Sequence, residues 1–80
     1  MSNSNRAGQQ ALHQYVIYEK PKDYPTKYVV RLWIIGPGTA QAGPVIATVD
    51  TIEEARERLP NGVDLIPITD PDPVIAEVWM

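Results

Sequence analysis

Few side chains in this 80-residue sequence are of the types that perform catalysis. The chain has no cysteine, which excludes thiol catalysis, disulfide bonds and zinc knuckles. Its one histidine, His13, has no serine, cysteine or aspartate beside it in a nucleophile arrangement. Glu53, Glu54 and Glu57 fall on a predicted exposed helix, whereas general acid–base catalysis needs carboxylates in a cleft with separated pKa values. We therefore predict that the protein is not an enzyme.

Two turns contain residue types that bind ions, but neither has the full pattern. Gly36-Pro37-Gly38-Thr39 follows a predicted strand, as a phosphate-binding loop does. However, Pro37 removes a backbone donor, and no Lys-Ser or Lys-Thr pair follows. Asp70 and Asp72, with Asp64 nearby, lack the further oxygen ligands and the terminal bidentate acid of a calcium loop. We predict plain turns at both places, and no metal or cofactor.

A loop rich in tyrosine and lysine, within residues 18–28, is a candidate for ligand binding. Aromatic and basic side chains in alternation can stack on the bases and neutralise the phosphates of a nucleotide or a single-stranded nucleic acid. Against this, the chain has a formal net charge of −3, and a general nucleic-acid binder normally has a basic surplus on one face. A small binding module of this kind is therefore the alternative function. Its candidate ligand residues are Tyr18, Lys20, Lys22, Tyr24, Lys27 and Tyr28.

The elements that must position these residues are predicted in the order β-β-β-α-β-β. Thr51–Leu59 is the predicted helix, because Thr51 and Glu54 form a capping box and Ile52, Ala55 and Leu59 form one apolar stripe. Runs of β-branched and aromatic residues between prolines and glycines predict the strands. The fold class is α+β: a single small domain with a largely antiparallel sheet of four to five strands and one helix on one face. The predicted strands are residues 14–19, 27–35, 44–49, 62–68 and 74–80.

Residues 1–12 are predicted to be a flexible tail, and residues 13–80 a single domain. The first ten residues are polar, with no apolar core of the length that a secretory signal needs. The chain also has no apolar run of about 18 residues, which excludes a membrane-spanning helix. A domain this short buries only about 60% of its unfolded surface and is marginally stable alone. Small domains without disulfides or bound metals commonly gain stability by forming oligomers.

Strand alternation predicts a second sheet face that is also apolar. In an alternating strand every second side chain points to the same face, so Val29, Arg31, Trp33 and Ile35 lie together. A short helix covers only one side of a sheet, which leaves these side chains facing water. An exposed apolar patch of several hundred Å² is at the upper limit for a monomer. The predicted interface residues are Val29, Arg31, Trp33, Ile35, Ile75, Glu77 and Trp79.

We predict that another copy of the chain covers this face, as a homodimer that acts through protein–protein association. If the two strands are neighbours, Arg31 pairs with Glu77 and Trp33 lies near Trp79. An active site shared across the interface would use Arg31 and Glu77, and would need a raised pKa at Glu77. Two alternatives stay open: the loops at residues 20–26 and 39–43 cover the face, or a different protein does.

Four segments of the sequence resemble a family of small, uncharacterised bacterial proteins. They are a Tyr-Pro loop region in 15–25, a Val-Val-Arg-x-Trp strand in 28–33, the helix start in 51–56, and an Asp-Pro-Val-Ile-x-Glu-Val-Trp strand in 72–79. The resemblance covers most of residues 15–80 and leaves out the tail. It implies a bacterial or phage source and a cytoplasmic location. It implies no activity, cofactor or catalytic residue.

Overall fold

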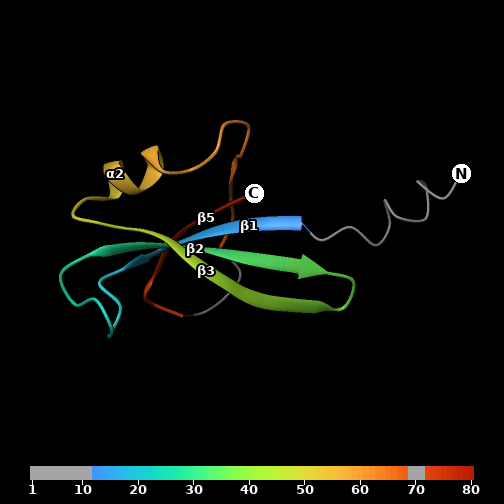
Figure 1. Ribbon diagram of the computed structural model, residues 1–80, viewed down its shortest axis with the longest axis horizontal. Helices are drawn as coiled ribbons and strands as arrows, with labels where there is room; N and C mark the ends of the chain where they lie inside the picture. Colours follow the sequence, from blue (N-terminus) through green and yellow to red (C-terminus); the bar gives the residue numbers. More distant parts are fainter. Residues whose placement is uncertain (1–11, 69–71) are drawn as a thin grey trace, which may run out of the picture.

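In the part of the chain that the structure describes, a five-stranded antiparallel sheet and one short helix make up the fold (Figure 1). The computed structural model describes residues 12–68 and 72–80. The strand order is β3-β2-β1-β5-β4, so the C-terminal strand pairs with the N-terminal one. The predicted α+β class and element order are confirmed. The elements are β1 (Leu12–Glu19), β2 (Tyr28–Gly36), β3 (Thr39–Val49), α2 (Ile52–Glu57), β4 (Leu65–Ile66) and β5 (Ile75–Trp79).

Strand β1 begins two residues earlier than predicted. Its first residue, Leu12, pairs with Ile35 of β2 and therefore belongs to the sheet rather than to the predicted tail. The rest of that predicted tail, residues 1–11, lies outside the described residues.

Strand β3 is longer than predicted and contains two irregularities. The segment 39–43 was predicted to be a loop because its residues are small, but it is paired with the end of β2. Between the pairs Trp33↔Ala42 and Arg31↔Val45, β3 has one residue more than β2. Pro44 sits within this bulge rather than at the first strand position, and β3 is an edge strand, where a missing N–H is tolerated. Because residues 39–43 are part of the sheet, they cannot fold over its face. Of the two loops that were alternatives for covering the second face, only residues 20–26 are left.

Close backbone packing explains the glycine in the same bulge. A Cβ placed on Gly43 would lie 2.9 Å from the carbonyl oxygen of Leu32, closer than real Cβ atoms approach backbone. Any side chain here would therefore push β3 away from β2. The Gly36–Thr39 connection is the predicted turn: Gly36 ends β2, Thr39 begins β3, and Gly38 has a φ of 69°.

Helix α2 starts where the capping box predicts and ends earlier than expected. The backbone N–H of Glu54 donates to the Thr51 hydroxyl at 3.1 Å, which satisfies one free donor of the first turn. The helix ends at Glu57, with Arg58 as its C-cap, shortly before Pro60. Ala55 of the predicted apolar stripe is fully buried, and Ile52 and Leu59 pack against the core beside it.

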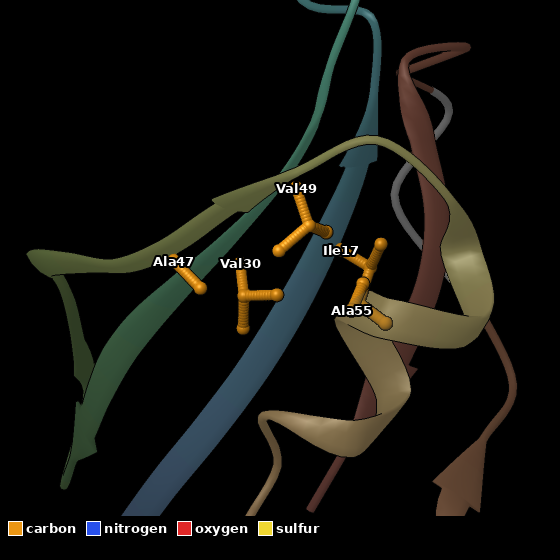
Figure 2. Packing of buried hydrophobic residues seen from close by; sticks show 5 residues of the cluster. All are labelled: Ile17, Val30, Ala47, Val49 and Ala55. Carbon is orange, nitrogen blue, oxygen red and sulfur yellow. The ribbon is translucent and has the colours of Figure 1, made fainter.

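The main hydrophobic cluster lies between the helix and the first three strands (Figure 2). Figure 2 shows Ala55 of the helix next to Ile17 of β1, with Val49, Val30 and Ala47 following on the neighbouring strands. Ile17 and Val30 are the largest fully buried side chains in the described part of the chain. The cluster contains few side chains, and they are small, so the helix side alone gives this domain a modest core. Its members are Ile17, Val30, Ala47, Val49 and Ala55.

Candidate association surface

The sheet face opposite the helix, here called the open face, is defined by cross-strand pairs. Residues that pair across strands point to the same side of a sheet. One row runs from Val45 through Arg31, Val16 and Val78 to Ile66 across all five strands. The next row joins Val29, Tyr18 and Ile75, and Trp33 and Ile35 follow Arg31 at every second position of β2. The same pairing places Leu12, Gln14, Ala40, Ala42 and Thr48 on this side, beside Trp33, Ile35 and Val29. The centre of the open face consists of Val16, Tyr18, Val29, Arg31, Trp33, Ile35, Val45, Ile66, Ile75 and Val78.

Two hollows lie side by side on the open face and share Tyr18 and Trp33. The larger has a volume of about 550 Å³, and the smaller about 240 Å³. The indole N–H of Trp33 donates to the Tyr18 hydroxyl at 2.8 Å, which fixes the two rings at the boundary between the hollows. Buried valines line the hollows: Val16 and Val78 in the larger and Val29 in the smaller. Trp33, Ile35 and Ile75 are partly buried around them.

Two loops border the open face without closing it. The β1–β2 loop contributes Pro21, Asp23 and Tyr24 to the wall of the smaller hollow. This loop is held by backbone hydrogen bonds from Lys20 to Lys27 at 2.8 Å and from Tyr24 to Pro21 at 2.8 Å. Pro67 and Asp72 border the larger hollow. Loop coverage of this face is therefore partial, and the hollows stay open between the loops.

Glu77 and Trp79 do not lie on the open face, and this part of the sequence prediction is wrong. Tyr18 pairs with Ile75, but the preceding residue Ile17 pairs with Glu77, so one extra residue of β5 is bulged out. A bulge shifts the alternation of a strand by one. Ile75 keeps its predicted side, whereas Glu77 and Trp79 turn to the helix side, and Val78 takes their place on the open face.

The predicted pair Arg31–Glu77 and the contact Trp33–Trp79 are thereby excluded, because their members lie on opposite faces. Glu77 instead binds Arg56 of the helix. The Arg56 Nε donates to Glu77 Oε1 at 3.0 Å, and Arg56 Nη2 pairs with Glu77 Oε2. The indole N–H of Trp79 donates to the same Oε1 at 2.9 Å. These contacts tie the helix to strand β5.

The hydrogen bond from Arg56 lowers the pKa of Glu77 below its ordinary value of 4.5, against the opposing effect of burial. The hydrogen bond from Trp79 lowers this pKa further. A shared active site using Glu77 would need the opposite shift. The pairing with Arg56 and Trp79 favours the ionised carboxylate, whereas a proton donor near neutral pH needs a raised pKa.

A pH-dependent loss of stability is expected from Glu77. Because its pKa is lower in the folded chain, its contribution is present above about pH 4.5 and is lost as the pH falls through the folded pKa. We expect Glu77→Gln to reduce the free energy of unfolding near pH 7 by about 1 kcal/mol, allowing for partial exposure. This deficit should shrink below about pH 4.5.

The measurement is urea unfolding of both proteins at several pH values. Glu57→Gln is the control, because Glu57 is exposed and has no ion pair in the described part of the chain. A deficit for Glu77→Gln that does not change with pH would show that the Arg56 contact does not stabilise the fold through charge.

The six residues of the candidate ligand site do not form one surface. Tyr18 and Tyr24 line the smaller hollow on the open face. Tyr28 packs against the core cluster on the helix side. Lys27 pairs with Asp50, at the end of β3. The remaining two, Lys20 and Lys22, are exposed. The sheet thus separates the aromatic rings that a nucleotide would need together.

The other residues singled out by type lie apart from one another. His13 is exposed on β1. Asp72 accepts the N–H of Val74 at 3.1 Å through its side chain, as in a turn, and Asp70 lies outside the described residues. Within residues 12–68 and 72–80, no cluster of His, Cys, Asp and Glu has the geometry of a metal site. The same residues include no helix long and apolar enough to cross a membrane.

Comparison of the chain with models of known families, with curated proteins and with solved structures found no match. The resemblance to a bacterial family therefore stays a prediction. The chemistry of the open face is what bears on function.

Proposed function

We propose that this is a non-enzymatic protein that acts through protein–protein association, as a homodimer joined by its open face. The observation that supports the proposal is a sheet face with two hollows, lined mainly by apolar side chains, that the described loops cover only in part. Trp33, Ile35 and Ile75 are only partly buried there. Covering them with a second copy would remove apolar surface from water at about 25 cal/mol per Å².

The faces, rather than the edges, of the two sheets are suited to meet. Strand β3 forms one edge, and its bulges and Pro44 interrupt the row of N–H groups that edge pairing requires. At the other edge, β4 has only two residues. A dimer made by continuing the sheet would therefore have few backbone hydrogen bonds, whereas the open face offers a broad apolar area.

The size of the face indicates which loops belong to the interface. A five-stranded sheet with strands about 4.8 Å apart is about 20 Å wide. A stable dimer of standard size buries about 800 Å² on each partner. The five strands have 8, 9, 11, 2 and 5 residues, a mean length of about 23 Å at about 3.3 Å per residue, so the sheet itself has a flat area of about 460 Å². Because this is less than a standard interface, the β1–β2 loop with Asp23 and Tyr24 is part of the proposed interface.

The alternative, a nucleotide or single-strand binding module in residues 18–28, has less support. Its tyrosines and lysines are spread over the two faces of the sheet, and Asp23 lies beside the tyrosine pair in the smaller hollow.

A matched pair of lysine substitutions tests the proposal. Ile35→Lys places a charge on the open face, and we expect a monomer at concentrations where the unmodified protein is a dimer. Leu65→Lys is the control, because Leu65 is 55% exposed and pairs with Trp79 on the helix side. It should leave the dimer intact. Light scattering behind a sizing column gives the masses. If Leu65→Lys dissociates the dimer and Ile35→Lys does not, the interface lies on the helix side and the proposed open-face interface is contradicted.

A further inference from the structure

Arg31 is a charged residue in the middle of an apolar surface. Its neighbours across the sheet are Val16 and Val45, and along the strand on the same face they are Val29 and Trp33. The side chain is half-buried. The ion pairs in the described part of the chain are Lys27–Asp50 and Arg56–Glu77, so the guanidinium of Arg31 has no carboxylate partner there.

Any partner that covers the open face must therefore supply a negative group for Arg31. Removing water from a guanidinium that has no hydrogen-bond partner opposes association strongly. Guanidinium and carboxylate groups pair in a bidentate geometry that offsets this cost. Because Arg31 has apolar neighbours on both adjacent strands, this requirement does not depend on how the rim of the interface is arranged.

The open face carries a suitable carboxylate of its own. Asp23, on the β1–β2 loop, lines the smaller hollow together with Arg31. The two residues nevertheless form no ion pair with each other, and Asp23 has no other ion pair within the described residues. One small surface thus carries a cation and an anion that both lack a partner.

We propose that the homodimer is two-fold symmetric and that Arg31 of each protomer pairs with the partner's Asp23. A two-fold rotation exchanges the positions of two groups on facing surfaces, so one contact of this kind is repeated on the other side of the axis. Both unpaired charges are then satisfied, twice in each dimer. A different protein would have to bring both a carboxylate and a cation at this spacing. The inference rests on the proposed homodimer and specifies its geometry.

Charge reversal tests the pairing. Arg31→Glu alone brings two carboxylates together at each contact, and Asp23→Arg alone brings two cations together. We expect each single variant to raise the dissociation constant on the order of 100-fold, with a smaller effect at high salt. The double variant, which swaps the two charges, should dimerise much more tightly than either single variant. Arg58→Glu is the control for the change in net charge, because Arg58 is exposed beside the helix.

A mixture of the two single variants provides the sharpest result. In their heterodimer the introduced carboxylate faces the introduced cation, and the native Arg31 faces the native Asp23. The mixture should therefore dimerise at concentrations where each variant alone is monomeric. Circular dichroism checks that each single variant is folded. The mixture also tests the pairing without the double variant, which carries two substitutions in one chain.

Three outcomes would overturn the pairing. If the single variants dimerise normally while Ile35→Lys is a monomer, the homodimer stands and the Arg31–Asp23 contact is wrong. If the single variants dissociate but their mixture does not associate, the two residues do not meet. A native protein that is monomeric throughout contradicts the homodimer itself, and the pairing with it.

Discussion

Trp33→Ala is expected to turn the dimer into a monomer at micromolar concentration. Trp33 lies between the two hollows and is held there by its hydrogen bond to Tyr18, so it enters the interface as a rigid aromatic anchor. Truncation of such an anchor costs about 2–4 kcal/mol, which raises the dissociation constant about 30- to 1,000-fold. Sedimentation equilibrium of the folded variant measures this change.

The other tryptophan, Trp79, lies on the opposite side of the sheet and serves as the control for Trp33→Ala. Trp79 packs against the core cluster and donates to Glu77 on the helix side. We expect Trp79→Phe, which keeps a ring but loses the N–H, to reduce stability without weakening association. If both tryptophan variants weaken the dimer equally, the face assignment given by the β5 bulge is contradicted.

Ile17→Ala is expected to destabilise the fold more than any other single truncation in the described chain. Ile17 is fully buried at the centre of the cluster beneath α2, on the strand that pairs with both β2 and β5. Removing three carbons there costs about 3–4 kcal/mol in lost transfer energy and cavity formation. A domain of this size has about 4–12 kcal/mol in total, so much of its stability is lost.

Urea denaturation at one fixed protein concentration measures the loss, because dimerisation makes stability depend on concentration. The control is Ile46→Ala, since Ile46 is 41% exposed at the β3 irregularity. That change should stay within about 0.5 kcal/mol of the native protein. A similar loss at both positions would mean that the cluster under the helix is not the main core.

Local sequence signals predicted the start of the helix and strand β2 well. The capping box at Thr51 and Glu54 is a short-range device, and the structure forms it at the predicted place. The apolar alternation of β2 is not interrupted by a bulge on its own strand, so Val29, Arg31, Trp33 and Ile35 share a face as predicted. These features depend on residues only a few positions apart.

The face of β5 was not predictable in the same way. Its bulge arises where the strand meets β1, in a pairing that joins the two ends of the described chain. A period of two counted through Ile75, Glu77 and Trp79 gives no sign of the extra residue. The contact that stabilises the shifted register, Arg56 with Glu77, spans 21 positions. The small residues of 39–43 were misassigned for a related reason, because strand pairing overrode their weak intrinsic preference.

The central claim, that the open face joins two copies, is tested most directly by the solution mass of the native protein. Light scattering behind a sizing column should cover about a hundredfold range of concentration, since mass action separates a tight dimer from weak encounters. We expect twice the chain mass of 8.9 kDa at the upper end, with dissociation, if any, only on dilution. A mass of one chain at every concentration would contradict the account.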